Sequence, residues 1–353
     1  MSKILKFKLQ TISPVHISSG EELDPFTYII KADKTGNKRL YYINLYNFIA
    51  LLNEDNRETL TQMLTETKVN KAMSNAISFI NQIFNEEQHI KAVLKSYPVN
   101  NSLYDEYLLR LQNFSITGFK INTSIKDGNF IPYLPGSSIK GMVKRAFIFK
   151  QDFNGYSNEF QKIEKKKQIE IDPFKMLKIS DSYSNNAELN IGYVRDFALN
   201  TLRIESDRIN VTAEFIKPGT VFDIEMVVNT NFNMANIFRA DIFKSEFKNE
   251  DNVLSFLNNY FTRLLQNEIK LFSEDGKNKS NEFIQLHDSI KKEYGDKVAF
   301  INIGKYGGKL IKVNNKDEKN IYARRYYTPK VEKSNTYTCS QVMPIGWAAL
   351  YYE

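Results

Sequence analysis

A proline-glycine turn leads directly into two serines and a one-sided basic helix in the run from Leu134 to Phe147, LPGSSIKGMVKRAF. A serine after such a turn is a good N-cap, so the helix is expected to begin at Ser137 or Ser138. At about 100° per residue, two faces separate. The polar face holds Ser137, Lys140, Gly141 and Lys144, and the apolar face holds Ile139, Met142, Val143, Ala146 and Phe147. The run predicts a helix that is buried on one side and basic on the other.

The glycine on the polar face suggests what this helix meets. Gly141 costs about 1 kcal/mol relative to alanine inside a helix, so its position favours a close approach of something to the backbone. A sugar-phosphate chain fits, because the first-turn amides and the helix dipole favour an anion and Lys140 and Lys144 add full charges. The alternative is an ordinary amphipathic helix whose lysines are only solvated.

Four further stretches accompany this run in a fixed order along the chain. They are TISPVHISSG at 11–20, ISDS at 179–182, EFIKPGTVF at 214–222 and GKYGGK at 304–309. Together the five stretches resemble the motifs of the RAMP superfamily, the RNA-binding proteins of CRISPR interference complexes. The run at 134–147 is similar to the signature PGSSLKG helix, and 11–20 is similar to the TPVHIGSG strand end, with Ser18 where many members have glycine.

Within the superfamily, the GEELDPF continuation at 20–26 and the closing MPIGW at 343–347 look most like one subunit of the type III-A (Csm) complex. That subunit caps the 3' end of the guide RNA (crRNA). The resemblance implies a role in crRNA maturation and antiviral defence. It implies as partners crRNA, the neighbouring backbone RAMP subunit and the small helical subunit, and it allows contact with target RNA and with host nucleases.

Composition agrees with a globular RNA-binding protein. The 353 residues are 42% hydrophobic and 25% charged, with a net charge of +7 that favours an anionic partner. Cys339 is the only cysteine, so an intramolecular disulfide is excluded and a structural zinc site is not expected. With no apolar signal core and no long apolar span, the chain is expected to be cytoplasmic.

Periodicity predicts an α+β fold, and the resemblance implies a ferredoxin-like βαββαβ RAMP core with a helical insertion. Strands are expected near 3–12, 28–30, 40–43, 175–182, 222–228, 298–303 and 309–313, a helix at 253–269, and a mobile basic loop at 154–172. The expected parts are the first strand and hairpin of the core at 1–45, the insertion at 46–116, the rest of the core at 117–313, and a C-terminal extension packing on the core at 314–353. The insertion could be a protein-contact surface or a packing lid.

The candidate RNA-binding residues form four groups. The predicted helix supplies Gly136, Ser137, Ser138, Lys140, Gly141, Lys144 and Arg145, and the first-strand end supplies His16, Ser18 and Ser19. The glycine-rich loop supplies Gly304, Lys305, Gly307, Gly308 and Lys309, and a basic-aromatic cluster supplies Arg324 and Arg325. No metal, cofactor or catalytic residue is expected.

Two other functions stay open at this stage. A metal-independent endoribonuclease that processes crRNA could use His16 as its base, although a histidine that contacts RNA or packs at the strand end is favoured. A purely structural assembly subunit would make no RNA contact. The aspartates Asp24 and Asp181 are not assigned a cleavage role.

Overall fold

The computed structural model describes residues 2–65, 67–152, 155–198, 203–204, 211–229, 237–273, 282–306, 323–328 and 342–353. The described chain forms three sheets with helices around them, so the predicted α+β class is confirmed. None of the helices in these ranges combines the length and the apolar character that a membrane crossing requires.

The first sheet is antiparallel, with the order β12-β15-β1-β11-β7. Its strands are β1 (Ser2–Thr11), β7 (Leu177–Ile179), β11 (Val221–Asn229), β12 (Val298–Asn302) and β15 (Trp347–Tyr351). In β11, Phe222, Ile224, Met226 and Val228 are buried, whereas Asp223 and Glu225 are exposed. This period of two means that one face of the sheet packs on the core and the other meets solvent.

Four helices belong to this part of the chain. They are α5 (Gly136–Asp152), α8 (Ala240–Glu246), α9 (Glu250–Ser273) and α10 (Glu282–Tyr294). Helix α5 packs on β7 and on α9, and α9 packs on β12. The strands predicted near 3–12, 175–182, 222–228 and 298–303 and the helix predicted at 253–269 are therefore confirmed, while the strand predicted at 309–313 lies outside the described residues.

The C-terminal strand lies inside the first sheet. Strand β15 is inserted between β1 and β12, and Trp347 is fully buried beneath α9, with its ring 6.3 Å from that of Phe261. The sequence predicted that the segment 314–353 packs back onto the core, and its last strand is hydrogen-bonded into the first sheet. Every residue of β15 is buried, as expected for a strand that is covered on both faces.

The second sheet follows the order β14-β13-β8-β10-β6-β2, with β9 paired to β8. Its strands are β2 (Ser18–Leu23), β6 (Ile121–Ser124), β8 (Leu189–Ala198), β9 (Arg203–Ile204), β10 (Val211–Ile216), β13 (Ala323–Thr328) and β14 (Met343–Pro344). Only the β6–β10 pair is parallel among these pairings. Because β1 leads directly into β2, the chain passes from the first sheet into the second near His16.

The third sheet, β3-β4-β5, forms a separate lobe with four helices. Its strands are β3 (Tyr28–Ala32), β4 (Lys38–Ile43) and β5 (Val93–Pro98), and its helices are α1 (Leu45–Leu51), α2 (Glu54–Leu64), α3 (Val69–Ile83) and α4 (Asn101–Gln112). Short 3-10 turns stand at Ile90–Ala92 and Ile116–Gly118. Asn44, Asn53 and Asn100 cap helices with their side chains, as asparagine commonly does.

The lobe corrects the prediction of a purely helical insertion. Strand β5 lies within it and pairs with β4, so the predicted hairpin belongs to the lobe and is not part of the first sheet. Ile29 and Tyr41 of the hairpin share a hydrophobic core with Phe48 and Ile80 of the helices. The hairpin and the helices thus bury each other's apolar faces.

The predicted basic loop at 154–172 is also wrong in part. Residues in this stretch form α6 (Tyr156–Gln161) and α7 (Lys165–Ile171), followed by a 3-10 turn at Pro173–Met176. Lys165, Lys166 and Lys167 are exposed on α7, as a basic surface segment would be. The short helices were missed because their sequence has no strong apolar periodicity.

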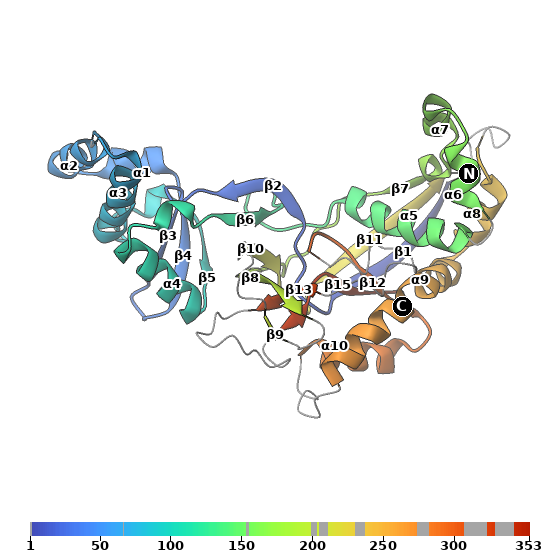
Figure 1. Cartoon of the computed structure of the whole chain (residues 1–353). Helices are drawn as coiled ribbons and strands as arrows, with labels where there is room; N and C mark the ends of the chain where they lie inside the picture. The colour runs from blue at the N-terminus through green and yellow to red at the C-terminus, as the bar shows by residue number, and fades with distance from the viewer. Residues whose placement is uncertain are drawn as a thin grey trace.

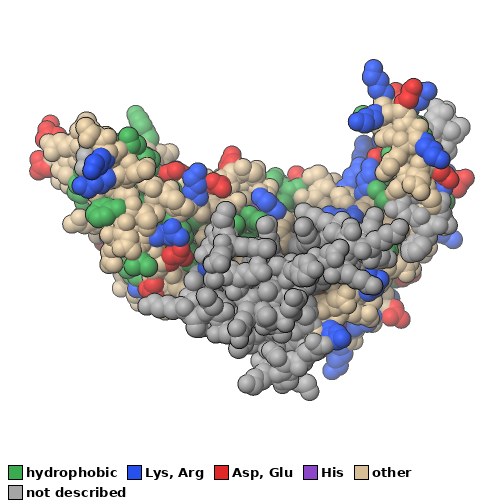
Figure 2. Space-filling view, in the orientation of Figure 1, with side chains coloured by type: hydrophobic (Ala, Val, Ile, Leu, Met, Phe, Trp, Pro, Cys, Tyr) green, Lys and Arg blue, Asp and Glu red, His purple; other side chains and the backbone are tan. Residues whose placement is uncertain are grey.

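The three parts form an arch with one hollow side (Figure 1). The lobe stands at one end, the second sheet lies in the middle, and the first sheet with its helices stands at the other end, where α7 forms the rim. The segment entering α5 and the segment leaving β7 run side by side across the floor of the hollow, joined by the bridge between Leu134 and Ser182 (Figure 1). Figure 2 shows lysine and arginine side chains along this floor and at the α7 tip.

Candidate nucleic-acid interface

Helix α5 begins one residue before the predicted N-cap, at Gly136. The Gly136 amide donates a hydrogen bond of 2.9 Å to Oδ1 of Asp181, which lies just beyond β7. The Ser138 amide bonds the Pro135 carbonyl at 2.9 Å. The predicted serine cap is therefore wrong, because a carboxylate from a distant segment takes that place. Asp181 already neutralises part of the positive end of the helix.

The first glycine of the run has a packing role. A Cβ on Gly136 would lie 1.9 Å from the carbonyl oxygen of Ile179, so only glycine lets the helix start sit on the end of β7. Gly136 is buried, and the prediction that it contacts RNA does not fit this position. Gly141 is different, since it is exposed and a Cβ there would meet nothing within 4 Å.

The polar face of α5 has two exposed small residues, with lysine and arginine side chains beside them. Ser137 and Gly141, one turn apart, are exposed, and Ser138 is half-buried.

The three charged side chains of this face have partners within the protein. The half-buried Lys140 donates from Nζ to the Leu177 carbonyl at 2.7 Å, and burial lowers its pKa. Lys144 pairs with Asp172 and lies over the Phe174 ring at 5.4 Å. Arg145 interacts with the Tyr260 hydroxyl. We name this surface, Ser137 and Gly141 with Lys140, Lys144 and Arg145, the α5 strip.

His16 is enclosed where β1 passes into β2. Its Nδ1 donates to the Glu214 carbonyl at 2.7 Å, its ring is 5.0 Å from that of Tyr306, and its side chain has no exposed surface. Burial lowers its pKa to about 4, and the charges of Lys305 and Lys126 act in the same direction. A contact between the His16 ring and RNA is at odds with this burial, and so is the hypothesis that His16 is the base of an endoribonuclease. The favoured sequence interpretation of a histidine packed at the strand end fits.

Ser18 and Ser19 lie at the edge strand of the second sheet. Ser19 is exposed, and its Oγ donates to the Thr123 carbonyl at 3.1 Å and lies 2.5 Å from Thr123 Oγ1. Ser18 is half-buried, and its Oγ accepts from the Gly20 amide at 3.3 Å. The pairing of β2 with β6 shifts register between Ser18 and Glu22. Such an irregularity can re-aim side chains at a sheet edge.

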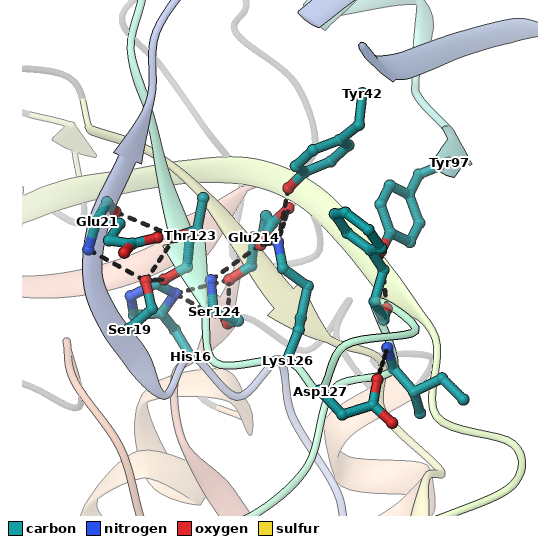
Figure 3. Close-up of polar contacts among 12 residues, drawn as sticks. His16, Ser19, Glu21, Tyr42, Tyr97, Thr123, Ser124, Lys126, Asp127 and Glu214 are labelled. Atoms are coloured by element: carbon teal, nitrogen blue, oxygen red, sulfur yellow. Dashed lines mark hydrogen bonds and ion pairs between the residues drawn. The ribbon is translucent and has the colours of Figure 1, made fainter. Parts of the chain in front are cut away.

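Beside His16, Glu214 and Lys126 form an ion pair that sequence inspection missed (Figure 3). Lys126 Nζ lies 2.7 Å from Oε2 of Glu214 and donates to the Tyr42 hydroxyl at 2.7 Å. The Ser124 amide also donates to Oε2, at 2.9 Å. Burial raises the pKa of the Glu214 carboxyl, against the bond from the Ser124 amide, and burial lowers the pKa of the Lys126 ammonium, against the charge of Glu21. The contact between the two opposite charges opposes both shifts.

This pair joins two parts of the arch. Glu214 belongs to β10 of the second sheet and Tyr42 to β4 of the lobe, while Lys126 reaches between them from the segment after β6 (Figure 3). The contact could not be predicted from a local sequence pattern, because Lys126 and Glu214 are 88 residues apart.

The glycine-rich loop is described only at its beginning. Gly304 has a φ of +82°, and a Cβ there would lie 2.4 Å from the His16 carbonyl oxygen, so glycine allows the loop to pack on the segment between β1 and β2. The Lys305 amide donates to the same carbonyl at 2.8 Å, and Lys305 is exposed. Gly307, Gly308 and Lys309 lie outside the described residues. The backbone of Arg324 and Arg325 lies in β13, but their side chains are outside the description.

In the ranges that the structure describes, no cluster of histidine, cysteine and acidic residues could hold a metal ion. The three histidines are apart from one another. His89 packs on Phe48 in the lobe, at 4.8 Å between ring centroids, and His287 lies on α10 against Phe300, at 4.4 Å.

The order of the sequence motifs and the α+β fold agree with one class of protein. The chain belongs to the RAMP superfamily, whose profile matches residues 8–334.

Two curated relatives carry the name CRISPR system Cms protein Csm5. The one from Streptococcus thermophilus is 23% identical over 245 residues, which are 65% of this chain and 65% of that protein, so the chain aligns with just under two thirds of its length. The one from Methanocaldococcus jannaschii is 24% identical over 348 residues, 91% of this chain and 76% of that protein.

Two solved structures share the fold. One is a chain in the cryo-EM structure of a Csm-crRNA-target RNA ternary complex from a type III-A CRISPR-Cas system, with a TM-score of 0.61, 16% identity, and coverage of 99% of this chain and 100% of that one. The other is the crystal structure of T. onnurineus Csm5, with a TM-score of 0.59, 17% identity, and coverage of 97% and 99%.

Proposed function

We propose that this protein is a crRNA-binding subunit of a type III-A CRISPR interference (Csm) complex, which holds the 3' part of the guide RNA and caps the backbone filament. In this role it contributes to crRNA maturation and antiviral defence. The RAMP profile, the relatives named Csm5 and the likeness to a chain of a Csm-crRNA-target RNA complex support this proposal.

The observation that carries the proposal is the α5 strip. Ser137 and Gly141 leave the helix backbone open to solvent, and Lys140, Lys144 and Arg145 border that opening. A nucleic-acid backbone can come close to a helix only where no side chain stands in the way, and cations at the border balance its charge. Contacts of this kind read the phosphates and the shape of RNA more than its base sequence.

We propose further that the first sheet is the ferredoxin-like core. Its elements follow the chain as β1, α5, β7, β11, α9 and β15, which is a βαββαβ order. The sheet places β15, β1, β11 and β7 side by side, with β1 and β11 in the centre. In that assignment β12 is an added edge strand, and the lobe and second sheet are elaborations.

Partners other than guide RNA belong to the same proposal. They are the neighbouring backbone RAMP subunit, the small helical subunit, target RNA and host nucleases that trim the guide. We include the lobe as a candidate protein-contact surface, since it leaves Tyr46 of α1 82% exposed and Val69 of α3 67% exposed.

Removing the two lysines of the α5 strip tests the proposal. The double variant Lys140→Gln with Lys144→Gln is expected to weaken binding of single-stranded guide RNA about tenfold at physiological salt. Each lost phosphate contact should also make the slope of log affinity against log salt shallower by about 0.7. Fluorescence anisotropy with labelled RNA across a salt series measures both quantities.

The control removes the same charge elsewhere. Lys150 lies in the last turn of α5 and pairs with Glu246 of α8, and Lys244 lies on α8 itself. The double variant Lys150→Gln with Lys244→Gln should bind guide RNA like the unmodified protein. Equal affinity and equal salt slope in both double variants would count against the α5 strip as the binding surface.

A further inference from the structure

Two tyrosines stack beside the start of α5. The rings of Tyr133 and Tyr183 lie 5.0 Å apart at an interplanar angle of 22°, and Tyr183 is 55% exposed. Among the described residues most aromatic side chains are buried, so a stacked pair with an exposed outer ring is unusual there. Exposure of such a ring leaves a flat apolar surface in water.

The backbone fixes this pair in place. Leu134 and Ser182 form an antiparallel bridge in which each amide donates to the other's carbonyl, at 2.9 Å both ways. Tyr133 directly precedes Leu134 and Tyr183 directly follows Ser182, so the bridge sets the two rings side by side. The Ser182 hydroxyl is anchored in turn on the Asp223 carbonyl of β11.

The same bridge ties the rings to the α5 strip. Gly136, the first residue of α5, comes two residues after Leu134, and its amide is held by Asp181, the residue before Ser182. The stacked pair and the first turn of α5 therefore belong to one rigid unit, on the two segments that cross the floor of the hollow (Figure 1). Tyr133 precedes Ser137 by only four residues, so an RNA chain bound over Ser137 and Gly141 can extend to the exposed ring.

We propose that Tyr183, backed by Tyr133, is a stacking platform for one base of the RNA strand whose phosphates lie on the α5 strip. This inference rests on the proposed RNA-binding function and adds a base contact to it. Stacking suits a guide-binding subunit, because every base offers a flat face and the contact tolerates any sequence. The platform is already ordered by Tyr133, so little side-chain entropy is lost when a base arrives.

The test compares Tyr183→Ala with Tyr183→Phe in the full-length protein, using labelled single-stranded guide RNA. Stacking on an aromatic ring contributes about 1–3 kcal/mol per base, so Tyr183→Ala should weaken binding about 5-fold to 150-fold. Tyr183→Phe keeps the ring and should bind within about twofold of the unmodified protein. The salt slope should not change in either variant, because no charge is lost. Phe114→Ala removes an aromatic ring of the lobe that is 54% exposed, and this matched control should leave RNA binding unchanged.

Abasic RNA identifies the partner of the ring. A series of guide RNAs with one abasic site each should contain a position that weakens binding to the unmodified protein but not to Tyr183→Ala. Such a position would be the stacked base.

The outcomes separate this inference from the proposed function. If Tyr183→Ala binds RNA normally while Lys140→Gln with Lys144→Gln does not, the platform is overturned and the α5 strip stands. If Tyr183→Ala keeps RNA affinity but no longer assembles with the other Csm subunits, the rings are a protein contact and the inference is wrong. If the unmodified protein does not bind guide RNA, the proposed function itself fails.

Discussion

Replacing Lys126 with methionine is expected to lower the free energy of unfolding by about 3–5 kcal/mol at pH 7.5, because the change leaves the carboxylate of Glu214 buried without its cation. The Glu214 side chain has no exposed surface and that of Lys126 is only 11% exposed. The variant also loses the bond from Lys126 to Tyr42, so the attachment of the lobe to the second sheet should weaken too.

A second substitution tests whether the loss of stability comes from the unpaired charge. In Lys126→Met with Glu214→Gln, the glutamine still accepts the Ser124 amide but carries no charge, so much of the lost stability should return. Denaturant unfolding of the unmodified protein, both single variants and the double variant gives the coupling between the two side chains.

The control for this cycle is an exposed ion pair. Lys120 and Glu22 lie 3.4 Å apart with side chains 52% and 47% exposed, so Lys120→Met should cost no more than about 1 kcal/mol. If Lys120→Met and Lys126→Met lowered the free energy of unfolding by similar amounts, the buried pair would contribute no more to stability than an exposed one.

Acidification is expected to destabilise the protein through His16. The folded protein holds the pKa of His16 at about 4, whereas an unfolded chain has a histidine pKa of about 6.5. Between these values the unfolded state binds more protons, so the free energy of unfolding falls as the pH drops from about 6.5 towards 4. The contribution of this one group is about 3 kcal/mol over that window.

The variant His16→Asn isolates the effect. Asparagine can keep the donor to the Glu214 carbonyl that Nδ1 supplies, but it does not titrate. The variant should be less stable at pH 7.5, where it lacks the ring contacts with Tyr306 and Phe215. The difference in stability should shrink by about 2.5 kcal/mol at pH 4.5. Parallel stability curves for the two proteins across this range would contradict a buried, neutral His16.

Local patterns were sufficient for several long elements of the fold, but not for the ten-residue strand β8. The strands β1 and β11 and the helix α9 bury one face each, so a regular alternation or stripe of apolar residues marks them in the sequence. Strand β5, VLKSYP, carries no such alternation, because its cover comes from the hairpin and helices around it. The short helices α6 and α7 were missed because their sequences also lack a strong apolar periodicity.

The candidate site, too, could be predicted only in part from local sequence patterns. The apolar face of α5 and the exposure of Gly141 follow from helical spacing. The cap of the helix does not, because Asp181 arrives from 45 residues away and replaces the serines that local rules favour. The Tyr133–Tyr183 stack and the Lys126–Glu214 pair likewise depend on contacts between distant segments.

The central claim is that the α5 strip contacts guide RNA, and ultraviolet crosslinking of the assembled complex, read by mass spectrometry, tests it most directly. We expect RNA adducts on peptides that contain residues 137–145. Adducts found elsewhere on this chain, with none on those peptides, would contradict the claim.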